Sequence, residues 1–315
     1  MKKNSNGYYI GIDSGGTKCE LIVAAKNNNE IRIIFDKTYK GVHYSVAGAE
    51  VYCETVADFI DDILSVCNLR IKDCLGICFG IAGARENKDR VRLKNIFSKN
   101  LRQKNIYVTT DAMTALFGAF EGKDGIILIS GTGSVLYGYS EKKIIRVGGW
   151  GRLIGDEGSG YWIGKRALNL VTKEFDDAKP KTSMSLLSKK LYDVFGITNK
   201  NINEKVFNES IEIQNIAPLV IECAGKKCSL SRQIIGESAE ALMYHIKKYL
   251  TLSKRKGKIQ ITFIGSIIEN RNPLSDKLKK EILNLKNVTV TEKKHSPAFG
   301  AVLLAMEKSD ILSKL

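Results

Sequence analysis

The sequence has no apolar stretch long enough to cross a membrane, and its first residues, Met1–Asn6, are too polar for a secretory signal peptide. We therefore expect a cytoplasmic protein without a membrane partner. The chain has seven cysteines, an odd number, and no export signal. Free, mostly buried thiols are expected in such a chain, and a disulfide framework is not.

Acidic residues are also scarce: 34 Asp and Glu stand against 49 Lys and Arg, a formal net charge of +15. This excess suits an anionic ligand, and it would also suit nucleic acid. The basic runs at 99–104 and 277–280 contain no aromatic residues, so we expect them to be solvated faces. With 315 residues, 43% of them hydrophobic, the chain is long enough for two globular domains.

The most informative stretch begins with the apolar run Ile126–Ile129, which is short and β-branched and predicts a buried strand. Small residues and hydroxyls follow at Ser130–Ser134, where backbone N–H groups can face an oxyanion. A glycine-rich loop further on contains Trp150, Asp156 and Glu157 and leads into a predicted helix. A plain connector needs turns but not a tryptophan and two acids together, so this stretch indicates a phosphate or sugar site.

A second glycine turn lies near the start of the chain. The strand Tyr8–Ile12 runs into Asp13–Lys18, and the apolar residues Leu21–Ala25 then resume. These glycines therefore join two strands, whereas those of a P-loop or dinucleotide fingerprint open a helix. Phosphate would be held by turn amides and the Thr17 hydroxyl, with Asp13 placed for a hydrated magnesium ion.

The arrangement of a strand, a glycine turn and a second strand occurs twice along the chain. Three strands, a helix, a strand, a helix, a strand and a helix fill the first part of the chain, and a new glycine hairpin starts at Gly125. This predicts two α/β domains facing a cleft. We expect residues 1–116 to form the first, with helix 298–313 a candidate to pack on it. Residues 117–315 would form the second, enlarged by a helical insertion at about 165–252.

Six motifs occur in order along the chain: Gly11–Lys18, Thr109–Ala112, Ile129–Ser134, Gly148–Trp162, Phe263–Ser266 and His295–Ala301. Together they resemble the first phosphate, catalytic aspartate, second phosphate, sugar, adenosine and C-terminal motifs of one group of proteins. That group is the N-acetylglucosamine kinases and the wider BadF/BadG/BcrA/BcrD-type ATPase family. The resemblance implies two actin-like (ribonuclease H-like) ATPase domains.

The resemblance also implies ATP-dependent phosphorylation of an amino sugar, with ATP and Mg²⁺ bound. Asp111 would be the general base that accepts the proton of the sugar 6-hydroxyl. Residues implied in ATP binding are Asp13, Gly15, Gly16, Thr17, Lys18, Gly131, Thr132, Gly133, Ala217, Gly265 and Ser266, with Asp13 holding Mg²⁺ through water. Residues implied at the sugar are His43, Tyr44, Asp111, Ser134, Gly149, Trp150, Gly151 and Asp156.

Several interpretations stay open. Some family members have asparagines in the loop that here is Gly41–Ser45 and at the position of Val135, so the sugar is undecided between N-acetylglucosamine, N-acetylmuramic acid, glucosamine and another hexose derivative. His43 is a candidate to replace a lost amide, or a surface histidine without a ligand. Asp111 could also be the N-cap of the helix that starts at Ala112, and Trp150 could be core filler.

Two other functions are the alternatives. Some ATPases of the family activate a dehydratase or reductase through an iron–sulfur cluster between subunits, but the cysteines here are predicted to be buried rather than exposed at a dimer face. A nucleic-acid-binding regulator is the other, although only seven residues precede the strand at Tyr8, too few for a helix-turn-helix segment. We expect no nucleic-acid partner, and a homodimer is left open.

Overall fold

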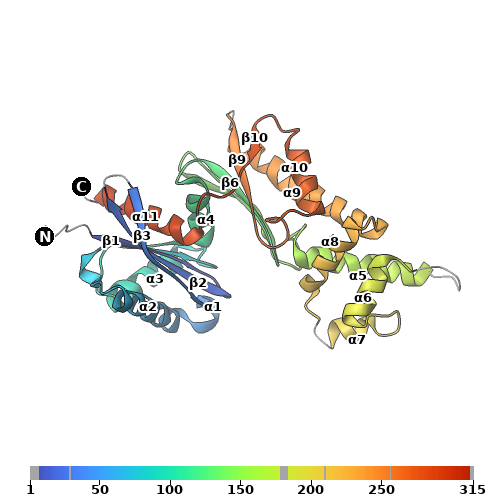
Figure 1. The fold of residues 1–315 in the computed structure, drawn as a ribbon, viewed down its shortest axis with the longest axis horizontal. Helices are drawn as coiled ribbons and strands as arrows, with labels where there is room; N and C mark the ends of the chain where they lie inside the picture. The colour runs from blue at the N-terminus through green and yellow to red at the C-terminus, as the bar shows by residue number, and fades with distance from the viewer. Residues whose placement is uncertain (1–6, 28–29, 178–183, 209–210, 256, 313–315) are drawn as a thin grey trace. The chain divides into compact units, whose positions relative to one another are not determined.

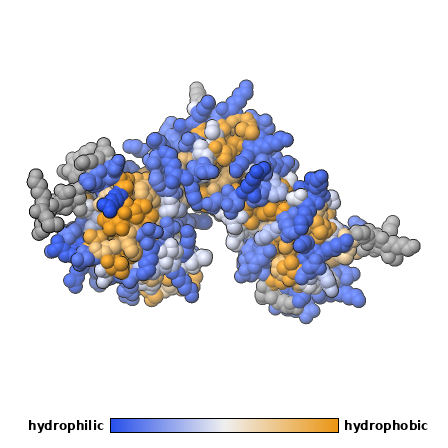
Figure 2. Space-filling model, in the orientation of Figure 1, coloured by the Kyte–Doolittle hydropathy of each residue, from blue (hydrophilic) through white to orange (hydrophobic). Residues whose placement is uncertain are grey.

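The computed structural model describes the whole chain except residues 1–6, 28–29, 178–183, 209–210, 256 and 313–315. Its contacts divide the chain into two compact units (Figure 1). Unit 1 consists of Met1–Lys123 and Lys293–Leu315, and unit 2 of Asp124–Glu292. Hydrophilic residues cover most of the face of both units that is in view in Figure 2.

Unit 1 is built on a five-stranded mixed sheet of order β3-β2-β1-β4-β5. Its strands are β1 (Tyr8–Ser14), β2 (Lys18–Asn27), β3 (Glu30–Lys40), β4 (Cys74–Ile81) and β5 (Ile106–Thr110). Strands β1 to β3 pair antiparallel, and β4 and β5 run parallel to β1. Strand β1 is apolar and buried on both sides, as expected for the centre of a sheet covered by helices.

The helices of unit 1 cover both faces of this sheet. They are α1 (Tyr44–Ala47), α2 (Ala49–Val66), η1 (Ile71–Asp73), α3 (Asn87–Asn100), α4 (Asp111–Phe120) and α11 (Pro297–Leu312). The side chains of Ile10 and Ile12 pack in one core with α2 and α3. On the other face, α11 lies against β1, β4 and α4, so the C-terminal helix belongs to the first unit. The segment from Gly41 to Gly48 contains the short helix α1.

Unit 2 repeats the strand order. Its sheet runs β10-β9-β6-β7-β8 with strands β6 (Gly125–Ser130), β7 (Ser134–Ser140), β8 (Lys143–Gly148), β9 (Ile259–Ile264) and β10 (Val288–Val290). Strands β6 to β8 are antiparallel, and β9 and β10 are parallel to β6. Strands β6, β7 and β8 thus take the places of β1, β2 and β3.

The helices of unit 2 include the predicted helical stretch between its two sheet halves. They are α5 (Gly160–Asp177), α6 (Leu186–Phe195), α7 (Ile202–Phe207), η2 (Ile213–Ile216), α8 (Ala217–Gly225), α9 (Ser229–Ser253) and α10 (Pro273–Ile282). Helix α9 precedes β9 as α2 precedes β4, and it buries apolar residues at helical spacing, among them Ile234, Leu242 and Ile246. The prediction of two α/β domains with glycine hairpins is therefore confirmed. In the described part of the chain, no helix combines the length and apolarity that a bilayer span requires.

Gly11 provides a test of the packing between β1 and α11. A Cβ added there would lie 2.2 Å from the carbonyl oxygen of Ala298 and 2.5 Å from the amide nitrogen of Val302. Because both are helix backbone atoms that cannot rotate away, we expect Gly11→Ala to lower the free energy of unfolding by about 1–3 kcal/mol in urea denaturation.

The matched control is Gly236→Ala in α9, where nothing lies within 4 Å of the added Cβ. A glycine in a helix interior is less stable than alanine, so this variant should gain about 0.5–1 kcal/mol. Equal effects of the two substitutions would contradict the packing described here.

Candidate active site

Two carboxylates lie at one end of the unit 1 sheet. Asp13 is at the carboxyl end of β1, and Asp111 directly follows β5. Strand β4 pairs in parallel with both β1 and β5, so the three strands end at the same edge. The Thr114 hydroxyl lies 3.1 Å from Asp13 Oδ1 and 2.8 Å from the carbonyl oxygen of Asp111, and it connects the two acidic segments.

Asp111 is not the N-cap of the helix that follows it. Thr110 is the N-cap, because its side chain accepts a hydrogen bond from the Met113 amide, and Asp111 is the first residue of α4. The Ala112 amide donates to Asp111 Oδ1 at 2.9 Å. Asp111 Oδ2 is not needed for capping, which leaves this oxygen available for chemistry.

The surroundings of Asp111 act on its pKa in both directions. Desolvation raises the pKa of this carboxyl above its usual range, while the Ala112 amide and the positive charges of Arg85 and His43 lower it. A carboxylate with a raised pKa is a stronger base than one in water, and the nearby cations keep the charged form accessible.

The pKa of Asp13 is shifted further from its ordinary value than that of Asp111. Burial, and after it the negative charge of Asp111, raise the pKa of Asp13 to about 7, and the Thr114 hydrogen bond only partly offsets them. An anionic Asp13 is therefore poorly stabilised by the protein alone. Such a carboxylate is a good ligand for a cation, because the cation supplies the charge that its surroundings lack.

The glycine turn and the His43 loop border this edge of the sheet. Between β1 and β2, the Gly15 amide donates to the Lys18 carbonyl and the Gly41 amide to the Thr17 carbonyl, while Gly16 and Thr17 themselves are exposed. The His43 side chain lies beside Gly16, 3.5 Å from where a Cβ on that glycine would be.

His43 and Tyr44 are held in place by neighbouring groups. His43 Nδ1 is 2.7 Å from the Ser45 hydroxyl, and the Tyr44 hydroxyl lies 3.2 Å from both the Gly83 carbonyl and Asp89. Because its charge also acts on Asp111, His43 is near the acidic pair. Lys18 begins β2, is largely exposed and pairs with Glu20 at 3.4 Å.

In unit 2, the corresponding hairpin turn is fixed by its neighbours. The Gly131 amide donates to Gly133, and the amides of Gly160 and Tyr161, at the start of α5, donate to the carbonyls of Gly131 and Thr132. The Thr132 side chain is left exposed. The turn therefore has a defined conformation with its hydroxyl available to a ligand.

The segment after β9 packs directly on this turn. Gly265 has a φ of +103°, and a Cβ added to it would lie 2.4 Å from the Ser130 carbonyl oxygen. Ser266 beside it is exposed. The predicted adenosine motif and second phosphate motif thus lie together in the structure. Ala217, the first residue of α8, is completely buried, so its side chain is not available to a nucleoside.

The loop between β8 and α5 is tied to the same hairpin. The Ser130 hydroxyl donates to the Gly158 carbonyl at 2.8 Å, and the Ser134 hydroxyl donates to the Glu157 carbonyl at 2.7 Å. Ser134 is buried, so it holds the loop in place rather than facing outward. These tethers position the acids of the loop relative to the turn.

Asp156 is a buried residue of this loop. It has a φ of +57°, a left-handed conformation uncommon for aspartate, and its Oδ1 accepts a hydrogen bond from the Gly151 amide at 3.1 Å. Its Oδ2 lies against Gly133, where an added Cβ would be only 2.7 Å away. Strain of this kind is often found at ligand-binding positions.

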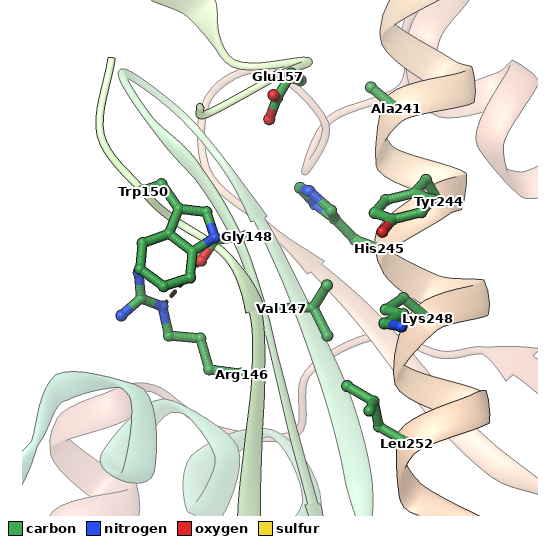
Figure 3. Close-up of a pocket in the computed structure, with 10 residues that line it drawn as sticks. All are labelled: Arg146, Val147, Gly148, Trp150, Glu157, Ala241, Tyr244, His245, Lys248 and Leu252. Atoms are coloured by element: carbon green, nitrogen blue, oxygen red, sulfur yellow. Dashed lines mark hydrogen bonds between the residues drawn. The ribbon is translucent and has the colours of Figure 1, made fainter. Parts of the chain in front are cut away.

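Trp150 is not core filler, because 71% of its surface is exposed. The Arg146 guanidinium lies 5.1 Å from the centre of its indole ring and donates to the carbonyls of Gly148 and Gly149. Arginine thus fixes the start of the loop and supports one face of the indole (Figure 3). The other parts of the ring are free to contact a ligand.

Sequence reasoning missed several residues of these sites. Thr114 and Arg85 act on the acidic pair, and Arg146 and His245 contact the loop between β8 and α5, which contains the sugar motif and is called the sugar-motif loop below. Thr114 had a detectable signal, since it lies three residues after Asp111 and so on the same side of the helix. Arg85, Arg146 and His245 show no local sequence pattern that would have pointed to these contacts.

The fold defines the class of protein. Two sheets of the same strand order, each opening with a glycine hairpin, form the actin-like ATPase fold that sugar kinases share. The chain is similar in structure to the proposed N-acetylglucosamine kinase of Chromobacterium violaceum, with a TM-score of 0.70 at 22% identity over 96% of this chain and 99% of the other. It is also similar to the ROK hexokinase of Thermus thermophilus, with a TM-score of 0.57 at 13% identity over 95% and 97%.

Sequence comparisons identify the family. The chain belongs to the BadF/BadG/BcrA/BcrD ATPase family, whose model matches residues 10–305. It is 32% identical over 310 residues to the N-acetylmuramic acid/N-acetylglucosamine kinase of Clostridium acetobutylicum, covering 96% of this chain and 99% of that one. It is 30% identical over 317 residues to the N-acetyl-D-glucosamine kinase of Dictyostelium discoideum, covering 95% and 97%.

The raised pKa of Asp13 predicts a pH-dependent effect on stability. A pKa near 7 in the folded chain, against an ordinary 3.8, means that the folded state holds this proton more tightly than the unfolded state. The stabilisation from that proton is complete below about pH 4 and is lost as the pH rises through 7. In the absence of magnesium, Asp13→Asn should therefore raise the melting temperature by several degrees at pH 8.

The rise in melting temperature that Asp13→Asn causes, measured by calorimetry, should grow between pH 4 and pH 7 and then level off. Asp36→Asn is the control, because it removes a carboxylate from the outer strand β3, away from the acidic pair. If Asp13→Asn raised the melting temperature equally at pH 4.5 and pH 8, the burial of a charged carboxylate would not be the cause of the rise.

Proposed function

We propose that this protein is an ATP-dependent kinase that phosphorylates the 6-hydroxyl of an N-acetylhexosamine, with N-acetylglucosamine as the first substrate to test. The family membership and the two curated relatives named above support a sugar kinase. The observation that carries the proposal is the acidic pair of Asp13 and Asp111 at one sheet edge, beside an exposed glycine turn.

In the proposed reaction, Asp111 is the general base. The sugar 6-oxygen attacks the γ-phosphorus of ATP, the bond from that phosphorus to the β–γ bridging oxygen breaks, and ADP leaves. Asp111 accepts the proton of the attacking hydroxyl as the new bond forms. The raised pKa of its carboxyl supports this role, since a base should bind a proton strongly enough to remove it late in the transfer.

The glycine turns are proposed to bind the phosphates. Phosphoryl transfer is catalysed mainly by positioning and by stabilising charge, and turn amides do both without a covalent step. In unit 1 the proposed residues are Gly15, Gly16 and Thr17 with Lys18 beside them, and in unit 2 they are Gly131, Thr132 and Gly133. The Gly15 and Gly131 amides donate within their own turns, so these two glycines shape the turns and the amides that follow them are proposed to face the phosphates. Gly265 and Ser266 are proposed for the nucleoside because they pack on the second turn.

Asp13 is proposed to hold Mg²⁺ through water. In the described part of the chain, no three His, Cys, Asp or Glu side chains come together as metal ligands. A single oriented carboxylate such as that of Asp13 fits magnesium, which usually keeps several waters and takes one or two carboxylates together with phosphate oxygens. A bound Mg²⁺ would neutralise phosphate charge. Thr114 would hold the Asp13 carboxylate in orientation for it.

The sugar is proposed to contact Gly149, Trp150, Gly151 and Asp156 of unit 2 and His43 and Tyr44 of unit 1. Carboxylate oxygens accept hydrogen bonds from hydroxyls, and an exposed indole can cover an apolar sugar face. Asp156 and Trp150 have these properties within one tethered loop. Ser134 is assigned to the support of that loop through the Glu157 carbonyl.

The cysteines do not fit the alternative of an iron–sulfur activator. Six of the seven are buried, and Cys67 is half-buried. Burial raises the pKa of the Cys78 and Cys74 thiols, which disfavours the thiolates that a cluster needs. This chain therefore presents no set of exposed thiolates for a cluster shared between subunits.

We further propose that the reaction takes place in the cytoplasm. All seven cysteines are free. Unpaired thiols persist in the reducing conditions of that compartment, where ATP is also abundant.

Asp111→Asn tests the proposed function. In a coupled ATP assay with N-acetylglucosamine, we expect kcat to fall by a factor of about 10²–10⁴, because the amide cannot accept the proton. The KM for the sugar should change by less than threefold, since Asn keeps the size and a hydrogen-bonding oxygen. A fall in kcat/KM that arises mainly from KM would instead assign Asp111 to binding.

Asp58→Asn is the matched control, because Asp58 is an exposed acid on α2. It removes the same charge from unit 1 and should leave both constants unchanged. If the unmodified protein turns over ATP with none of the amino sugars, the proposed function is wrong.

A further inference from the structure

A hollow lies in unit 2 beneath the loop that carries Trp150. It has a volume of about 580 Å³ and is bounded by β8 on one side and α9 on the other (Figure 3). Arg146 and Trp150 line one side, and Tyr244, His245 and Lys248 project from α9. We call it the β8–α9 pocket.

The pocket is not a necessary result of the fold. Strand β3 and helix α2 occupy the same places in unit 1, and there Tyr39 stacks on Phe59 with ring centres 4.2 Å apart. Lys37 and Asp62 add an ion pair at 2.7 Å. The space that unit 1 fills with its own side chains is therefore left open in unit 2, although both units have the same strand order.

His245 places a buried polar group in the wall of the pocket. Its side chain is only 4% exposed, and its Nδ1 has no hydrogen-bond partner among the residues that the structure describes. Its ring lies close to Gly148, where an added Cβ would be 2.7 Å from Nε2. A buried ring nitrogen without a partner costs free energy, and a ligand in the pocket that bonds to His245 would recover it.

Charge is distributed along the pocket. Glu157, a residue of the loop between β8 and α5, lies at one end, and Lys248 lies farther down α9 (Figure 3). Neither forms an ion pair with any residue in the described part of the chain. Ala241 and Lys248 are seven residues apart on one helix face, a distance of roughly 10 Å. A complementary ligand would carry hydroxyls at one end and an anionic group at the other.

We propose that the β8–α9 pocket receives a carboxylate-bearing substituent of the amino sugar, with Lys248 as the residue that selects for it. The inference rests on the proposed function, because Trp150 and the loop of Asp156 would bind the sugar itself. An ether-linked lactate on an N-acetylhexosamine has this chemistry: it extends a few ångströms from the ring and ends in a carboxylate. His245 would hydrogen-bond the extended group, and Lys248 would pair with its charge.

The test compares N-acetylmuramic acid, which carries such a lactate, with N-acetylglucosamine, which does not. The measured ratio is kcat/KM for N-acetylmuramic acid divided by kcat/KM for N-acetylglucosamine. Lys248→Met should lower this ratio by about tenfold or more, the usual effect of losing a hydrogen bond to a charged group. Lys248→Arg should retain most of the ratio, and Lys248→Glu should lower it further. Lys247→Met, an exposed neighbour on the same helix, should leave the ratio unchanged.

Binding is measured separately by titration calorimetry with each sugar and with free lactate. We expect N-acetylmuramic acid to bind with a Kd that Lys248→Met raises about tenfold. The proposal is overturned if N-acetylmuramic acid does not bind, if Lys248→Met leaves the ratio unchanged, or if free lactate binds the pocket as tightly as the sugar does. Phosphorylation of N-acetylglucosamine alone would overturn the pocket assignment and leave the proposed function intact.

Discussion

The burial of the Asp13 carboxylate beside a second acid, Asp111, is the constraint on which the candidate site depends. Both acids lie at the same edge of the unit 1 sheet, because β1, β4 and β5 run parallel and end there. Burial and the negative charge of Asp111 raise the pKa of Asp13. The fold keeps this unfavourable arrangement through the surrounding core and the Thr114 bridge. A carboxylate that is destabilised in the absence of a cation is a suitable ligand for one.

A different kind of support holds the loop of unit 2. Its glycines give the backbone freedom, which by itself would leave Trp150 and Asp156 without a fixed position. Ser130 and Ser134, at the two ends of the hairpin turn, use their hydroxyls to bind carbonyls of this loop. Arg146 holds its first residues. The hairpin turn and the loop between β8 and α5 are thus fixed to each other within one unit, so a ligand that orders one also orders the other.

The sequence predicted the parts of the fold and site that depend on local pattern. The two glycine hairpins, the strand periodicity and Asp111 at a strand end can all be recognised from neighbouring residues. Predictions that depended on three-dimensional context were less secure: Thr110 took the capping position that Asp111 was a candidate for, and Ala217 is buried. The roles of Arg85 and His245 could not be predicted, because each acts on residues far away in sequence.

The repetition of one strand order in both units shows how the two have diverged. At the outer edge of unit 1, Tyr39 and Phe59 close the space between strand and helix. At the same edge of unit 2, the corresponding elements leave a pocket lined by His245 and Lys248. A hydrophobic stack contributes more to stability than an open cavity with an unpaired buried nitrogen. Because unit 2 retains the less stable arrangement beside its sugar-motif loop, the difference is better explained by ligand binding than by folding.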